Sequence, residues 1–181
     1  VVVDNCILPR DLLDRAKLMA QQATGIPETH ILISATHCHS GPAAMDIAQC
    51  KADPEYQSFL ARRIADGIRR AASNRVPAKI GWGFGEMPSE VFNRRWHMKE
   101  GGIIENPFGN KKDQVRMNPP RRSPLLDRPA GPTDTQVPVL SVRHADGRPL
   151  ALLSNYSLHY VGGTGAGTIS ADYFGVFADR I

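Results

Sequence analysis

The sequence predicts an α/β fold in which a mixed β-sheet is flanked by helices, with a long irregular loop and an antiparallel hairpin. Apolar, β-branched runs at residues 1–3 and 31–37 enclose an amphipathic segment, which is the pattern of a strand–helix–strand unit. A second helical periodicity covers residues 53–72. Two further apolar runs flank the turn signal Asp146-Gly147 and predict the hairpin.

Composition is that of an ordinary globular protein. The 181 residues are 41% apolar and 22% charged, which excludes a disordered chain and allows one good core. No apolar run approaches the length of a membrane span, and no signal-peptide pattern opens the chain. Three cysteines, an odd number without a Cys-x-x-Cys pair, argue against a disulfide framework.

The first helix is expected from Pro9 to Ala23, with Gly25 beyond its end. Its apolar face is predicted to consist of Leu12, Leu13, Ala16, Met19, Ala20 and Ala23. If the flanking strands are parallel, Asp4 lies at the same sheet edge as His37. Asp4 is then either a loop or cap residue or a partner that orients a metal ligand.

The second helix is predicted to begin at the N-cap Asp53, with Pro54 in its first position, and to run to about Ala72. Residues 78–86 are predicted to form a strand. Alternate glycines leave one face of that strand nearly bare, which predicts close approach by another backbone. These glycines are Gly81, Gly83 and Gly85.

Periodicity disappears over residues 91–138, so this region is predicted to be a long irregular loop of the functional or mobile kind. Most of the excess positive charge lies between Arg94 and Arg128. Its basic residues are scattered among Pro and Gly with few aromatics, so we expect a solvated loop and no nucleic-acid partner. The guanidinium fork of Arg94 suits a carboxylate, a phosphate or a developing oxyanion, the alternative being an ordinary surface arginine.

The hairpin is expected to pair residues 137–143 with a return strand that runs from about residue 150 to His159. The glycine cluster at 162–167 lacks the Gly-Lys-Ser/Thr ending of a phosphate loop and is expected to form a flexible wall of a site. Residues 170–173 open the last predicted helix.

A His-x-His pair follows the predicted strand at residues 31–37. In an extended backbone, His37 and His39 point to the same face and can share a metal, or one can bind metal while the other moves protons. The alternative is a polar strand end whose histidines are satisfied by neighbours. Cys38 would point the opposite way and is expected to be a small buried filler.

The string at residues 36–42, Thr-His-Cys-His-Ser-Gly-Pro, resembles the first zinc motif of the neutral/alkaline, non-lysosomal ceramidase family. Three more segments resemble the family in the expected order: residues 92–95, residues 130–140, and residues 154–159 followed by 169–173. The sequence Phe-Asn-Arg-Arg at residues 92–95 more closely resembles the uncharacterised bacterial branch of the family, since the characterised ceramidases have Asn-Arg-Ser-Pro there.

This resemblance implies a zinc amidase with an α/β catalytic domain, of which residues 1–181 would be one part, truncated at both ends. His37 and His159 match the family's first two zinc ligands, and His39 matches the histidine that helps hold the scissile amide. Arg94 matches the family's site arginine. The family's remaining ligands, a Glu and a Tyr, have no match in this chain.

The chemistry implied is hydrolysis of an amide by a metal-activated water, with Zn²⁺ as cofactor. His39 or Arg94 would stabilise the oxyanion, and His39 is a candidate for the acid that protonates the leaving amine. The substrate would be a small-molecule or lipid amide such as N-acyl-sphingosine (ceramide) or a related N-acyl lipid. Family members are usually exported, which implies a secreted or periplasmic location and leaves room for peripheral membrane contact. The sequence does not indicate an oligomeric state.

Two other hydrolase classes also carry a His-x-His pair. A metallo-β-lactamase-like hydrolase needs an Asp two residues after the second histidine, where this chain has Gly41. An amidohydrolase barrel needs a strand–helix repetition that is missing here. A non-catalytic ligand-binding module of the same fold, without metal, remains the alternative. A third possibility is a nucleic-acid-binding protein that uses the loop between Arg94 and Arg128, for which salt-sensitive binding to DNA or RNA would be the evidence.

Overall fold

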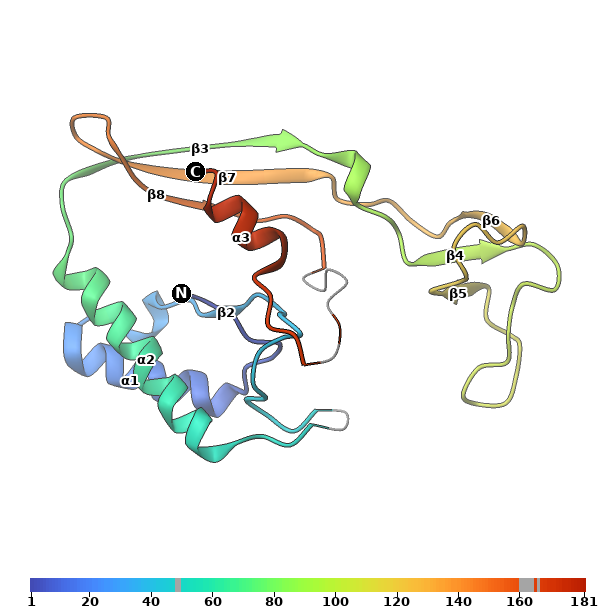
Figure 1. Cartoon of the computed structure of the whole chain (residues 1–181), viewed down its shortest axis with the longest axis horizontal. Helices are drawn as coiled ribbons and strands as arrows, with labels where there is room; N and C mark the ends of the chain where they lie inside the picture. The colour runs from blue at the N-terminus through green and yellow to red at the C-terminus, as the bar shows by residue number, and fades with distance from the viewer. Residues whose placement is uncertain (48–49, 160–164, 166) are drawn as a thin grey trace. The chain divides into compact units, whose positions relative to one another are not determined.

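The computed structural model describes residues 1–47, 50–159, 165 and 167–181. It confirms the α/β class and the antiparallel hairpin, and the described strands fall into three sheets (Figure 1). The chain divides into two compact units. The first unit comprises Val1–Lys79, His144–Arg148 and His159–Ile181, and the second comprises Ile80–Arg143 and Pro149–Leu158.

The first unit opens with the predicted strand–helix–strand connection. Strands β1 (Val2–Val3) and β2 (Ser34–Ala35) pair in parallel, and helix α1 (Arg10–Thr24) connects them. The helix begins after Pro9 and ends at Gly25, whose φ of 74° is the left-handed conformation that glycine adopts without a Cβ penalty. Both ends agree with the sequence prediction to within one residue.

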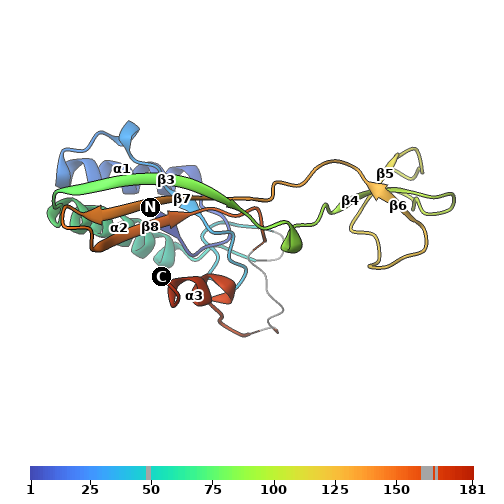
Figure 2. The same ribbon diagram turned by 90° about the horizontal axis from the view of Figure 1, so that it is seen from above.

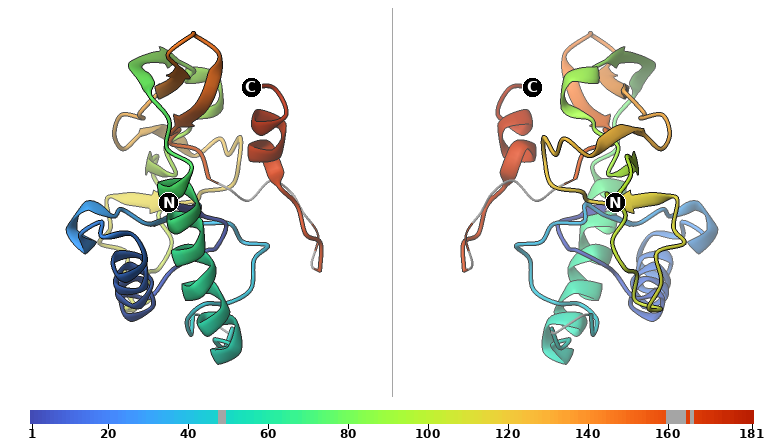
Figure 3. Two further views of the ribbon diagram at one scale, coloured as in Figure 1. Left: turned by 90° about the vertical axis from the view of Figure 1, so that its left-hand side faces the viewer. Right: turned by 90° about the vertical axis from the view of Figure 1, so that its right-hand side faces the viewer.

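Helix α2 (Pro54–Ser73) begins at the predicted cap. The Asp53 carboxylate accepts hydrogen bonds from the backbone N–H groups of Glu55 and Tyr56, at 2.8 and 3.2 Å. Helices α1 and α2 lie side by side, and with β1 and the segment before β2 they enclose the hydrophobic core (Figures 1 and 3). The buried core residues are Val3, Leu12, Ala16, Ala20, Ile31, Ile33, Ala44, Leu60, Ala61, Ile64, Ala65 and Ile68.

A second sheet has the strand order β3 (Ala78–Glu86), β7 (Gln136–His144) and β8 (Pro149–Ser154) (Figure 2). Strands β7 and β8 form the predicted antiparallel hairpin, and Gly147 takes a φ of 94° in its turn. Strand β8 ends at Ser154, so the prediction that the return strand continues to His159 is wrong.

The glycine face of β3 also differs from the prediction. A Cβ placed on any of its three glycines would meet no atom of the described chain within 4 Å, so no backbone approaches there. All nine residues of the strand are exposed. The apolar side chains that alternate with the glycines are correspondingly open to solvent, and they are Ile80, Trp82 and Phe84.

The region expected to be irregular contains a small third sheet. Strands β4 (Arg95–Met98), β5 (Val115–Met117) and β6 (Leu126–Pro129) pair antiparallel in the order β5-β4-β6. The sequence did not predict these strands because each is only three or four residues long and mixes charged with apolar residues. Apart from residues 136–138, which begin β7, the rest of the region lacks regular structure.

The last helix, α3 (Asp172–Ala178), begins where the sequence predicted. The Ser170 hydroxyl accepts the backbone N–H of Asp172 at 3.0 Å. The glycine-rich segment before it falls mostly on residues 160–164 and 166, which lie outside the described residues. Within the described residues, none of the helices is both long and apolar enough to cross a membrane.

Candidate metal centre

Three histidine rings converge in the first unit. The ring centroids of His37, His39 and His159 are 4.8, 4.8 and 4.9 Å apart, and the ring planes meet at 71–81°. The Nε2 atoms of His39 and His159 are separated by 3.1 Å. Imidazoles that share one tetrahedral zinc at ~2.0–2.1 Å would have ligand nitrogens about 3.3 Å apart and centroids about 5 Å apart. The cluster therefore has the spacing of a metal site built from imidazoles.

The backbone reaches this arrangement by a route other than the predicted strand. Strand β2 ends at Ala35, His37 has a φ of 62°, and His39 lies in a turn. The expectation that an extended backbone carries both rings to one face is therefore wrong, although the two rings do lie together. A left-handed residue with a side chain costs roughly 1–2 kcal/mol, so contacts elsewhere must hold it.

One such contact comes from Cys6. The Nδ1 atom of His37 lies 3.0 Å from the Cys6 carbonyl oxygen. A carbonyl can only accept, so in the tautomer that donates to Cys6 the proton is on Nδ1 and Nε2 keeps its lone pair for a ligand; in the other tautomer Nδ1 itself carries the lone pair. Metal-binding histidines are commonly oriented in this way by a carbonyl. The sequence left Asp4 as either a loop or cap residue or the partner that orients a metal ligand. Its side chain is exposed, and the contact to His37 comes from the Cys6 carbonyl, two residues later.

The loop that follows the histidine pair is anchored to the end of β1. Asn5 is 1% exposed, and its Nδ2 donates to the Pro42 carbonyl at 3.1 Å and to the Tyr56 hydroxyl at 2.8 Å. A Cβ on Gly41 would lie 3.1 Å from the Asp4 carbonyl oxygen, so only glycine fits without displacing backbone. The motif's Gly-Pro is therefore a packing feature, which holds the loop against the core.

The Cys6 thiol lies on the same cluster. Its sulfur and one ring nitrogen from each of His37 and His39 all lie within 4.8 Å of one another. Cys6 is half-buried, and this burial, followed by the like charges of Cys38 and Cys50, raises the pKa of its thiol. The sequence did not identify Cys6, because its position has no motif spacing and depends on the pairing of β1 with β2.

Cys38 behaves as predicted. It is 6% exposed, and its sulfur accepts the backbone N–H of Ser40 at 3.4 Å. The residue between the two histidines is thus a buried filler that also stabilises the turn.

Arg94 belongs to the second unit. Its Nε donates to the Asn118 side-chain oxygen at 3.0 Å, and its carbonyl accepts the Asn118 backbone N–H at 2.8 Å. The side chain is exposed and ties two strand ends of the small sheet together. Its assignment as the site arginine stays a prediction.

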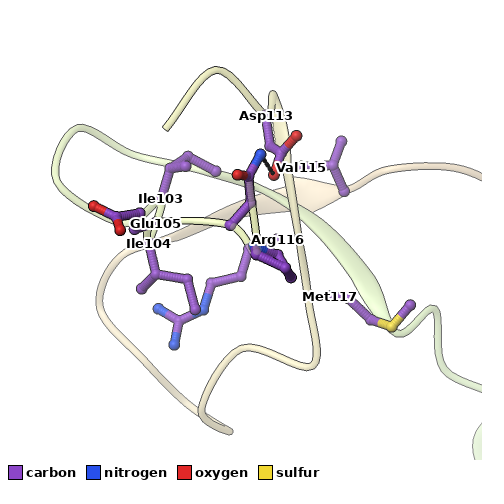
Figure 4. A pocket seen from close by; sticks show the side chains of 9 residues that line it. Ile103, Ile104, Glu105, Asp113, Val115, Arg116 and Met117 are labelled. Atoms are coloured by element: carbon purple, nitrogen blue, oxygen red, sulfur yellow. Dashed lines mark hydrogen bonds between the residues drawn. The ribbon is translucent and has the colours of Figure 1, made fainter. Parts of the chain in front are cut away.

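The second unit also contains a hollow of about 180 Å³, beside β5 (Figure 4). Its polar groups form hydrogen bonds within the surrounding loop. Arg116 donates to the Gly102 carbonyl at 3.2 Å, and Asn106 donates to Asp113 at 3.1 Å. These contacts stabilise the loop and direct no converging charge at a ligand. The residues that line the hollow are Ile103, Ile104, Glu105, Asn106, Pro107, Asp113, Val115, Arg116 and Met117.

The chain matches no protein-family model, and no curated protein matches it. The resemblance to the ceramidase family therefore rests on its sequence motifs.

Proposed function

We propose that this chain is part of a zinc-dependent amide hydrolase that cleaves an N-acyl substrate, such as N-acyl-sphingosine or a related lipid amide. The observation that carries the proposal is the convergence of three imidazoles from two segments that are far apart in the sequence, at the separations a shared metal requires. The substrate class comes from the motif resemblance.

The donor set fits zinc. His37 and His159 would hold the ion, and imidazole nitrogen is a donor that suits Zn²⁺. In the tautomer in which His37 donates from Nδ1 to the Cys6 carbonyl, Nε2 would be its ligating atom. When bound in such a site, zinc lowers the pKa of a water to about 7 and polarises a carbonyl.

One role open to His39 is to hold the amide beside the metal. Its Nε2 lies 3.1 Å from that of His159, so it reaches any group held beside the metal ligands. There it can donate to the carbonyl oxygen of the amide and pass a proton to the leaving amine. All three rings are exposed, which leaves the site open to a substrate as large as a lipid amide.

The test is the zinc content of the full-length protein to which this chain is proposed to belong, together with hydrolysis of a panel of N-acyl amides. Wild type and His30→Ala, which alters an exposed histidine outside the cluster, should both hold zinc and hydrolyse amides. His37→Ala should lose both properties together. Folded wild-type protein without zinc would contradict the proposal, whereas zinc without hydrolysis would identify a ligand-binding module.

A second variant separates the two roles open to His39. If His39 holds the amide, His39→Ala keeps its zinc and loses hydrolysis. If His39 is a third zinc ligand, zinc and hydrolysis are lost together.

A further inference from the structure

The Cys6 sulfur lies at ligand distance from a histidine nitrogen. Its Sγ atom is 3.6 Å from Nδ1 of His37. A sulfur at ~2.3 Å and a nitrogen at ~2.0–2.1 Å from one tetrahedral zinc would be separated by about 3.6 Å. The observed distance is therefore the one expected for two ligands of a single ion.

A third donor completes the set. The ligand atoms of Cys6, His37 and His39 all lie within 4.8 Å of one another. They come from the end of β1 and from the loop after β2, which the parallel pairing of Val3 with Ala35 brings together. This pairing belongs to the packed part of the first unit and fixes the points from which the two donor-bearing segments continue.

We propose that Cys6 is a sulfur ligand of the metal centre and binds, as a thiolate, the same ion as His37 and His39. In this arrangement His39 is a metal ligand and does not hold the amide, which is the second of the two roles that His39→Ala separates above. This assignment rests on the proposed metal site and adds a donor that the motif resemblance does not contain. When the sulfur binds, the thiol proton leaves to solvent. His37 then ligates through Nδ1, carries its own proton on Nε2 and releases the Cys6 carbonyl.

The two other cysteines are placed differently. Cys38 is buried, and its sulfur accepts a backbone N–H. Cys50 is exposed and is not one of the three clustered donors. Of the three cysteines, therefore, only Cys6 is placed to supply a thiolate ligand. A set of one sulfur and two imidazoles favours Zn²⁺ and Co²⁺ over Mg²⁺ and Ca²⁺, which prefer oxygen ligands.

Cobalt gives a direct readout that does not depend on catalysis. The full chain, reduced with a phosphine, is titrated with Co²⁺ and followed by absorption. Wild type should develop visible d–d bands and a near-ultraviolet thiolate-to-cobalt charge-transfer band. Cys6→Ser should keep the d–d bands and lose the charge-transfer band, while Cys50→Ser should keep both.

The two proposals fail differently. Cobalt binding without a charge-transfer band in wild type, or a band that survives in Cys6→Ser, would overturn the assignment of Cys6 and leave the histidine site intact. No binding of cobalt to folded wild type would overturn both. A band lost in Cys50→Ser but not in Cys6→Ser would assign the thiolate to Cys50 instead.

Discussion

The two units bury their apolar residues very differently. In the first unit, Leu12, Ala16 and Ala20 are 0% exposed, and every buried residue of the described hydrophobic core belongs to this unit. In the second, Trp82 and Phe84 are 84% and 67% exposed. The second unit is held mainly by strand pairing and loop hydrogen bonds. The candidate metal centre therefore lies in the first unit, whose packed core can fix the positions of side chains.

This difference has a physical consequence for function. A metal site needs ligands held to within a few tenths of an ångström, and close packing of a core supplies that rigidity. The loop after β2 obtains it from Asn5 and from the tight approach of Gly41 to β1. Loss of those anchors should loosen the metal site even though neither residue is one of its proposed ligands.

The largest expected effect is a difference in the free energy of unfolding between a substitution in the first unit and one in the second. Leu12→Ala removes a fully buried side chain and should lower the free energy of unfolding by about 2–5 kcal/mol. Trp82→Ala removes a larger side chain that is exposed and should change it by less than about 0.5 kcal/mol. Urea denaturation of the two variants measures both. Equal losses would show that the second unit has a buried core of its own.

The next effect links the core to the site. Asn5→Ala removes two donated hydrogen bonds from a buried position and should cost about 1–3 kcal/mol. Zinc affinity should fall with it, because the loop that carries His37 and His39 loses its anchor. Asn5→Asp keeps the shape and removes the donors, so it should weaken zinc binding in the same direction. Calorimetric zinc titration is the measurement, and an unchanged affinity in both variants would show that the loop is fixed by other contacts.

A smaller effect is expected at the helix cap. Asp53→Ala removes the acceptor for two backbone N–H groups at the start of α2 and should cost about 1 kcal/mol. Because α2 supplies part of the core of the first unit, the loss should appear in its thermal unfolding. Asp53→Asn, which keeps a capping oxygen, is the matched control and should retain most of the stability. An Asp53→Ala protein as stable as wild type would mean that Pro54 alone sets the helix start.

The smallest effect on stability is expected for an exposed ion pair on the surface of α1. Asp14 pairs with Arg10 at 2.8 Å on α1, with side chains 47% and 84% exposed. Solvent and salt screen such a pair, so Asp14→Ala should change stability by less than about 0.5 kcal/mol. Denaturation at low and high salt would measure it. A loss above 1 kcal/mol would mean that this face of α1 is covered by another part of the protein.

The sequence predicted the parts of the fold that local chemistry decides. The Asp53-Pro54 start and the Gly25 end are set by backbone hydrogen bonding and allowed dihedral angles, and both were found where expected. The three short strands β4, β5 and β6 were not predicted, because a strand of three or four residues has no readable period. The open glycine face of β3 was misjudged because glycines do not reveal what lies opposite them.

The sequence named three histidines of the candidate site and did not predict the contacts that support them. The motif resemblance pointed to His37, His39 and His159, which the structure brings together. Their role as a metal site, like that of Arg94, stays a prediction. The left-handed backbone of His37 and the role of Cys6 arise from a contact between the end of β1 and the loop after β2. No local pattern encodes a contact between residues 31 positions apart.

The most direct test is whether the two distant histidine segments form one metal centre. Calorimetric titration of the full chain with zinc should show one ion per chain, and His159→Ala should weaken binding by about a hundredfold or more, as His37→Ala does. His30→Ala should bind like wild type. Unchanged zinc affinity in His159→Ala would contradict the shared centre and would leave the His-x-His pair as a site, or a structural cluster, on its own.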